Sequence, residues 1–98
     1  MSRQFSIAFD ARFVKDLKEA RAWYDQQTEG LGEKFYKAVA ESLIIIKRNP
    51  LFQIRYDDVR CYAVKKYPYL IHFTVDETEM KIIVRAIIHT SRNTNLQG

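Results

Sequence analysis

The sequence predicts an α+β fold: an N-terminal strand, an antiparallel helix hairpin, and then a three-stranded antiparallel meander, forming one small sheet. Two observations predict it. Apolar residues recur at spacings of three and four in the first half of the chain, whereas β-rich runs with alternating side chains fill the second half. The chain has 98 residues, of which 47% are hydrophobic, so we expect a single domain over residues 1–98.

The first strand is expected over residues 4–9, "QFSIAF", where β-branched and aromatic residues mix. Asp10 follows, and its carboxylate can cap a helix by accepting from a free backbone N–H. From Ala11 to about Gln27 an apolar stripe recurs at helical spacing. Its members are Phe13, Leu17, Ala20 and Tyr24. This pattern predicts an amphipathic helix, within which we interpret Trp23 as a packing residue.

The second helix follows a break at the two glycines of "TEGLGE". The helical period then resumes at Leu31 and continues to "RNP", where Pro50 prevents the helix from extending. A connection this short favours an antiparallel hairpin of the two helices. Their shared apolar stripe needs a flat surface to cover.

Three β-rich runs supply that surface: "VRCYAVKKY", "PYLIHFTV" and "MKIIVRAIIH". Only short connections separate them, which predicts a meander. We interpret the acidic cluster at 76–79 as a solvated turn rather than a metal site, because it lacks a calcium-loop pattern. We expect residues 55–58, "RYDD", to be loop and residues 93–98 to be a flexible tail.

Alternation along these runs divides their side chains between two faces of the sheet. The inward face is expected to contain Val59, Cys61, Ala63, Ile71, Phe73, Ile82, Val84, Ala86 and Ile88. The outward face is expected to contain Arg60, Tyr62, Lys66, His72, Thr74, Lys81, Ile83, Arg85, Ile87 and His89.

The outward face has two interpretations. Antiparallel sheets often keep one face in water, where arginine and histidine are ordinary. Against this, Tyr62, Leu70, Ile83 and Ile87 add apolar area rimmed by charge, which favours a protein partner. Arg85 and His89 are four residues apart, so about 13 Å of strand separates their Cα atoms. They cannot form a tight catalytic pair, but they can flank an extended anionic or peptide ligand.

Composition limits the chemistry. The net charge of +4 and the pI near 9.3 are compatible with a polyanionic partner without requiring one. Cys61 is the only cysteine, which excludes an internal disulfide, and with His72 and His89 it makes no zinc cluster. His89 can act as an acid or base, but no serine or cysteine nucleophile is spaced to assist it. We expect no metal and no cofactor.

Neither export nor membrane insertion is indicated, because the first nine residues lack a long apolar region and no apolar run reaches the length of a membrane span. We therefore expect a cytoplasmic protein that makes no contact with a membrane.

The order of these elements, together with three segments, resembles the RelE/ParE superfamily of bacterial toxins from type II toxin-antitoxin systems. The segments are "ARAWYDQQTEGLGEKFYKAVAESLIIIKRNP", "VRCYAVKKYPYLIHFTV" and "IIVRAIIHTSRN", which together cover most of the chain. The resemblance implies a growth-inhibiting toxin that a cognate antitoxin neutralises in a hetero-oligomer.

The resemblance also bears on the target. Where ribosome-dependent messenger-RNA endonucleases of the superfamily carry basic residues, this chain has Cys61, Ala63 and Leu70, and a clear terminal tyrosine is missing. "YPYLIHF" and "RAIIHTSRN" resemble the ParE branch, whose members are associated with poisoning DNA gyrase. We therefore expect a non-catalytic gyrase toxin. The alternatives are an endonuclease acting on ribosome-bound messenger RNA, with Arg85, His89 and Arg60 as catalytic candidates, or an inactive interaction module.

The antitoxin is expected to wrap the helix hairpin and to lay an apolar, acidic segment along the toxin. The surface for antitoxin or target is expected to comprise Arg60, Tyr62, Lys66, His72, Ile83, Arg85, Ile87, His89 and Arg92.

Overall fold

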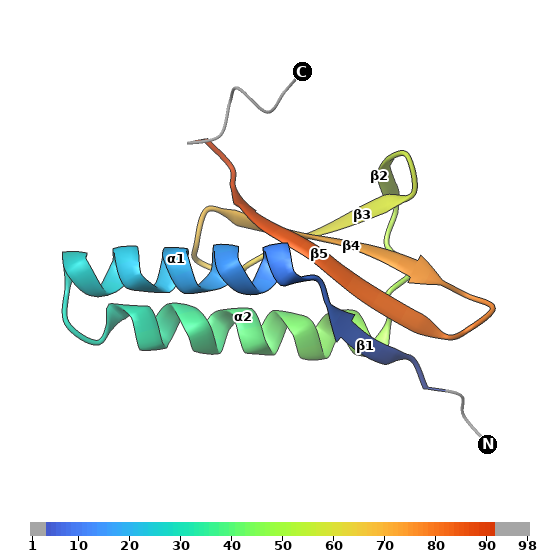
Figure 1. Cartoon of the computed structure of the whole chain (residues 1–98), viewed down its shortest axis with the longest axis horizontal. Coiled ribbons are helices and arrows are strands. Elements are labelled where there is room, and N and C mark those ends of the chain that lie inside the picture. The colour runs from blue at the N-terminus through green and yellow to red at the C-terminus, as the bar shows by residue number, and fades with distance from the viewer. Residues whose placement is uncertain (1–3, 92–98) are drawn as a thin grey trace.

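A helix hairpin packs on one face of a mixed sheet in the computed structural model, which describes residues 4–91 (Figure 1). The elements of this part of the chain are β1 (Ser6–Phe9), α1 (Ala11–Gln27), α2 (Leu31–Arg48), β2 (Ile54–Tyr56), β3 (Val59–Ala63), β4 (Tyr69–Asp76) and β5 (Lys81–His89). Neither of these helices is both long and apolar enough to cross a bilayer.

The sheet order is β1-β5-β4-β3-β2, and β1 runs parallel to β5 while the other pairs are antiparallel. The core lies between the sheet and the helices, where Phe35, Val39 and Ile46 of α2 belong to one buried cluster with Ile71 and Phe73 of β4. We call this side of the sheet the helix-covered face and the opposite side the outer face.

Local sequence signals place the helix ends. Asp10 caps α1 as predicted, since its Oδ1 accepts from the Arg12 backbone N–H at 3.1 Å. Gly30 has a φ of 85°, a left-handed conformation that glycine adopts without strain. At Gly32 a Cβ would lie 2.6 Å from the Arg21 carbonyl oxygen, so only glycine allows the two helices to approach this closely.

The predicted α+β class is confirmed, but the predicted sheet was incomplete. The expectation of a loop at residues 55–58 was wrong in part, because Ile54–Tyr56 form β2 and pair with β3. Asp57 in the connecting turn has a φ of 50°, which aspartate tolerates better than most residues. The three-stranded meander is therefore extended at one edge by β2 and at the other by β1.

A β-bulge on β5 reverses the predicted alternation. His72 pairs with Ala86 but Phe73 pairs with Val84, so Arg85 is an extra residue on β5. Beyond it, Ile87 turns to the helix-covered face and is only 3% exposed. The prediction that Ile87 faces outward was therefore wrong, because one inserted residue shifts every later side chain to the other face.

The faces of β3 were also assigned the wrong way round. Arg60 pairs with Phe73 and Tyr62 pairs with Ile71, so both point to the helix-covered face. Cys61, which pairs with His72, points to the outer face instead. Alternation in a sequence defines two faces of a strand but does not state which of them the helices will cover.

Candidate functional site

The structure separates the three catalytic candidates. Arg85 lies on the outer face, whereas Arg60 lies on the helix-covered face. His89 pairs with Tyr69, a core residue, and its ring contacts the Tyr69 ring at 5.1 Å between centroids. The prediction that His89 shares a face with Arg85 was therefore wrong, again because of the bulge at Arg85. No single reacting group is within reach of all three side chains.

The Arg60 side chain is largely buried and bonded to neighbouring segments of the fold. Its side chain is only 14% exposed, its Nη1 donates to the Phe52 carbonyl oxygen at 2.6 Å, and its Nη2 lies 4.0 Å from Glu77. Beside it, the Tyr62 ring packs on Phe52 at 5.3 Å between centroids. Arg60 therefore holds the segment that leads from α2 into β2, and the predicted outward position was wrong.

The remaining predicted residues are divided. His72, Ile83 and Arg85 lie on the outer face, as expected. Lys66 instead lies in the turn between β3 and β4, where it lines a pocket together with α2, so its predicted outer-face position was wrong. Arg92 falls outside the described residues.

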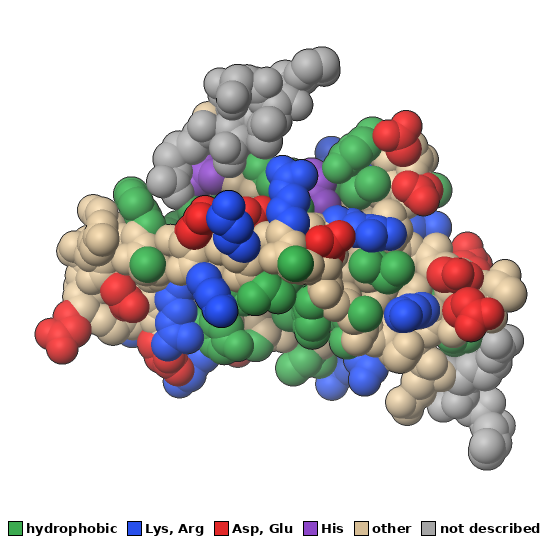
Figure 2. All heavy atoms as spheres, in the orientation of Figure 1, with side chains coloured by type: hydrophobic (Ala, Val, Ile, Leu, Met, Phe, Trp, Pro, Cys, Tyr) green, Lys and Arg blue, Asp and Glu red, His purple; other side chains and the backbone are tan. Residues whose placement is uncertain are grey.

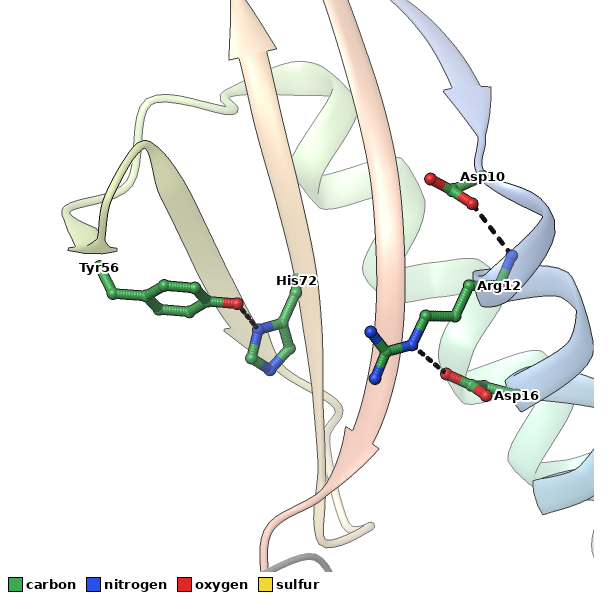
Figure 3. Close-up of polar contacts among 5 residues, drawn as sticks. All are labelled: Asp10, Arg12, Asp16, Tyr56 and His72. Carbon is green, nitrogen blue, oxygen red and sulfur yellow. Dashed lines mark hydrogen bonds and ion pairs between the residues drawn. The ribbon is translucent and has the colours of Figure 1, made fainter. Parts of the chain in front are cut away.

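His72 is the centre of a polar cluster on the outer face. Its Nδ1 lies 3.0 Å from the Tyr56 hydroxyl of β2 (Figure 3). The same Nδ1 lies 3.6 Å from the Cys61 thiol of β3. Hydroxyl and thiol are both donors, so we assign Nδ1 as the acceptor, which places the ring proton on Nε2. The cluster thus presents an N–H donor to solvent or to a ligand.

Two arginines act on this histidine. Arg12 extends from the start of α1 toward β5 and His72, and its Nε lies 3.7 Å from Asp16 Oδ2 (Figure 3). Burial is the main cause that lowers the pKa of His72 below 6.5, and the charges of Arg12 and Arg55 lower it further. His72 is therefore neutral at neutral pH.

Arg85 forms the neighbouring part of the outer face. Its Nε donates to Thr74 Oγ1 at 3.2 Å, and its Nη1 lies 3.5 Å from Asp10 Oδ2. The three cations Arg12, Arg55 and Arg85 thus give this surface a positive character that two carboxylates, Asp10 and Asp16, offset in part. The arrangement suits recognition of an anion.

Nucleophilic chemistry has little support on this face. Burial raises the pKa of the Cys61 thiol and also that of the Tyr56 hydroxyl, so both groups stay protonated at neutral pH. Among residues 4–91, no three His, Cys, Asp or Glu side chains gather in a way that could hold a metal ion. The cluster is built for hydrogen bonding and charge recognition.

A second candidate surface is a groove of about 320 Å³ along the helix hairpin. It is lined by Phe9, Phe13, Val14, Leu17, Lys18, Arg21, Tyr36, Val39, Ala40 and Leu43. Phe9, Val14 and Tyr36 are 47%, 39% and 43% exposed. Hydrophobic side chains gather between the two helices, with lysines and arginines beside them (Figure 2). We call this surface the apolar groove.

The sequence analysis missed two residues of the outer face, Tyr56 and Arg12, because their neighbours there come from distant segments of the chain. Tyr56 lies in the stretch interpreted as loop, although "IRY" and "VRC" around two aspartates carry a hairpin signal that could have found it. No local signal assigns Arg12 to His72, because α1 and β4 meet only in the folded chain.

Comparisons with known proteins identify the fold and the family. The family model described as the ParE toxin of the type II toxin-antitoxin system, parDE, matches residues 7–94. A chain of the chromosomal ParDE system from P. aeruginosa has a TM-score of 0.80 at 15% identity, with 92% of this chain and 100% of that chain covered.

Two further solved structures share the fold. A chain of the intact E. coli RelBE toxin-antitoxin complex has a TM-score of 0.68 at 15% identity, with 90% of this chain and 99% of that chain covered. A chain of the RelBE2 complex from Mycobacterium tuberculosis has a TM-score of 0.64 at 15% identity, with coverages of 89% and 99%. A search by sequence among curated proteins gives no match.

At such low identities the structural likeness establishes the fold alone, whereas the family model spans most of the sequence. The chain therefore belongs to the ParE toxin family of type II toxin-antitoxin systems, within the RelE/ParE superfamily.

Proposed function

We propose that this toxin is neutralised by a cognate antitoxin that fills the apolar groove, and that its target is DNA gyrase. The observation that carries the antitoxin part is the exposure of Phe9, Val14 and Tyr36 in one continuous groove. Exposed apolar patches rimmed by polar residues mark sites of protein association.

The groove also indicates the chemistry of its occupant. Lys18 and Arg21 also line the groove, and the Arg21 guanidinium lies 4.9 Å from the centre of the Tyr36 ring. An antitoxin segment with apolar side chains at helical spacing and acidic residues between them matches this lining. The similar chains come from a ParDE toxin-antitoxin system and from a RelBE toxin-antitoxin complex, which supports such a hetero-oligomer.

The gyrase part rests on the ParE family match and on the separation of the nuclease candidates. Arg60, Arg85 and His89 do not converge, and Cys61 and Tyr56 are protonated. A gyrase poison needs a recognition surface rather than a catalytic centre, and the outer face supplies one. A cytoplasmic location belongs to the same proposal, because gyrase acts there.

One observation favours a second candidate function, cleavage of ribosome-bound messenger RNA. Arg12 and Arg55 act on a neutral His72 on the outer face, where Arg85 also lies, and such a group can hold a phosphate and exchange a proton. Under that function His72, rather than His89, is the acid or base.

The deciding experiment is induced expression in bacteria, with and without the antitoxin gene. It is followed by a supercoiling assay on purified gyrase and by an assay of messenger-RNA integrity on translating ribosomes. We expect growth arrest that the antitoxin relieves, impaired supercoiling and intact messages. Codon-positioned cleavage with normal supercoiling would establish the second candidate. Tight antitoxin binding without growth arrest would identify an inactive module.

A further inference from the structure

A pocket on the other side of α2 from the apolar groove is lined mainly by charged side chains. It measures about 360 Å³ and lies between α2 and the turn that joins β3 to β4. Its lining is Lys34, Lys37, Ala38, Glu41, Lys65, Lys66 and Tyr67, and we call it the lysine pocket. At 3.6 residues per turn, its α2 residues and those of the apolar groove occupy opposite sides of the helix.

The lysine pocket concentrates the charge of the protein. Four lysines and one glutamate give its lining a formal charge of +3, whereas the whole chain carries +4. None of the four ammonium groups forms an ion pair with another residue in 4–91. By contrast, the arginines Arg12, Arg21, Arg60 and Arg85 each have a carboxylate partner. No ion pair in the described part of the chain therefore holds these lysines, and Glu41 offsets only one of their four charges.

The turn that supplies two of these lysines is strained. The Tyr67 backbone N–H donates to the Val64 carbonyl oxygen at 3.3 Å, which makes Lys65 and Lys66 the central residues of a four-residue turn. Lys66 has a φ of 74°, at a position where glycine or asparagine is favoured. Strained backbone is concentrated at functional sites. A lysine here gives the pocket a charge that the preferred turn residues do not carry.

We propose that the lysine pocket holds the phosphate backbone of a duplex nucleic acid. Lysine ammonium groups bind phosphates as point charges and read no sequence. The lining contains no arginine, asparagine or glutamine that could make paired hydrogen bonds to a base edge. Binding is therefore independent of sequence. This inference holds for either candidate target. A toxin of gyrase meets duplex DNA, and a toxin of the ribosome meets duplex RNA.

An acidic protein segment fits this pocket less well. Segments that bind in grooves need apolar anchors, and the uncharged lining here is limited to Ala38 and Tyr67. Such anchors find their place in the apolar groove, on the opposite side of α2. A polyanion needs no anchors, since the release of counterions drives its binding.

The test is fluorescence anisotropy of the full-length chain with a labelled short DNA duplex and with an RNA duplex of the same sequence. If four phosphates are neutralised, the slope of log K against log salt is about −3.6 on DNA, which is roughly a 150-fold loss between about 50 mM and 200 mM salt. The duplex that binds more tightly identifies DNA or RNA as the source of the phosphates.

Variants assign the binding to the pocket. We expect Lys37→Gln to weaken binding and to reduce the salt slope by about one, and Glu41→Gln to strengthen binding. Lys15→Gln removes the same charge from α1 outside the pocket and is expected to leave the salt slope nearly unchanged. Lys66→Gly relieves the strained turn, so it is expected to weaken binding while raising the urea midpoint. This opposite pair of effects excludes unfolding as the cause.

Several outcomes would overturn the proposal. One is the absence of salt-dependent binding to both duplexes. Another is equal weakening by Lys37→Gln and Lys15→Gln, which would assign the effect to net charge alone. A third is unchanged nucleic-acid binding in Lys37→Gln together with a loss of antitoxin affinity, which would assign the pocket to an acidic protein.

Discussion

The apolar groove and the outer face of the sheet differ in how far their side chains satisfy one another. On the outer face Tyr56 meets His72, and Arg85 meets Thr74 and Asp10. In the groove, Phe9, Val14 and Tyr36 leave much of their apolar surface in water. The contrast indicates that the outer face is organised before any ligand arrives, while the groove gains most of its stabilisation from a partner.

The largest effect is expected from a charge placed in the apolar groove. Val14→Glu should fold, because Val14 is already exposed, but it sets a carboxylate against an apolar and acidic antitoxin segment. We expect the antitoxin affinity to fall by about 100-fold or more. Isothermal titration calorimetry with the purified antitoxin measures it.

Ile44→Glu is the matched control for Val14→Glu. Ile44 is a 53% exposed apolar residue of α2 that does not line the groove, so its change is expected to affect the affinity little. Equal losses in both variants would show that net charge, rather than the groove, governs neutralisation.

The next effect concerns the helix-covered face. Arg60→Ala removes a short hydrogen bond from a charged donor to the Phe52 carbonyl, together with a packed aliphatic stem. We expect a loss of about 2 to 3 kcal/mol in the free energy of unfolding, measured by urea denaturation. Arg55→Ala, at an exposed position of β2, should change stability by about 0.5 kcal/mol or less. A stable Arg60→Ala variant without toxicity would instead return Arg60 to the functional residues.

On the outer face, Arg85→Ala should separate function from stability. Its ion pair with Asp10 is exposed to solvent, and such pairs contribute about 1 kcal/mol at most. We expect toxicity, measured as gyrase inhibition in the supercoiling assay, to fall about tenfold, which corresponds to about 1.4 kcal/mol of target binding. Lys81→Gln, an exposed charge change on the same strand, is the control, and unchanged inhibition in Arg85→Ala would argue against an active outer face.

The smallest effect is a pH dependence from His72. The pKa of His72 is lower in the folded chain than its ordinary value of 6.5, so the unfolded chain binds more protons at acidic pH. Stability that is present above pH 6.5 is therefore lost as the pH falls from 6.5 through the folded pKa. Urea midpoints between about pH 5 and about pH 7.5 should show this slope flattened in His72→Gln. The His89→Gln control should retain the pH slope of the urea midpoint that His72 produces.

Local sequence signals predicted most of the elements. Helical spacing located α1 and α2, and Asp10 and Pro50 marked one end of each helix, because capping and the missing proline N–H act within a few residues. The β-branched runs located β3, β4 and β5, because this signal also acts within a few neighbouring residues. β2 was missed since a three-residue strand gains its stability from its neighbour rather than from its own residues.

The candidate site was predictable only in part. His72 and Arg85 were expected on the outer face and lie there, whereas Arg60, Tyr62, Ile87 and His89 do not. The bulge at Arg85 explains why Ile87 and His89 were assigned to the wrong face. The choice of covered face explains the same error for Arg60 and Tyr62. Both features depend on register, which hydrogen bonds between strands fix across the sheet.

The sequence by itself determined the class of fold, the order of the helices and the three longest strands, and the positive charge, since these follow from neighbouring residues and composition. Only the tertiary structure decided which side of β3 is covered, where Arg12 meets His72, and how Lys34 and Lys37 come to share a pocket with Lys65 and Lys66. The physical reason is that side chains far apart in the chain become neighbours only when the sheet and the helix hairpin pack together.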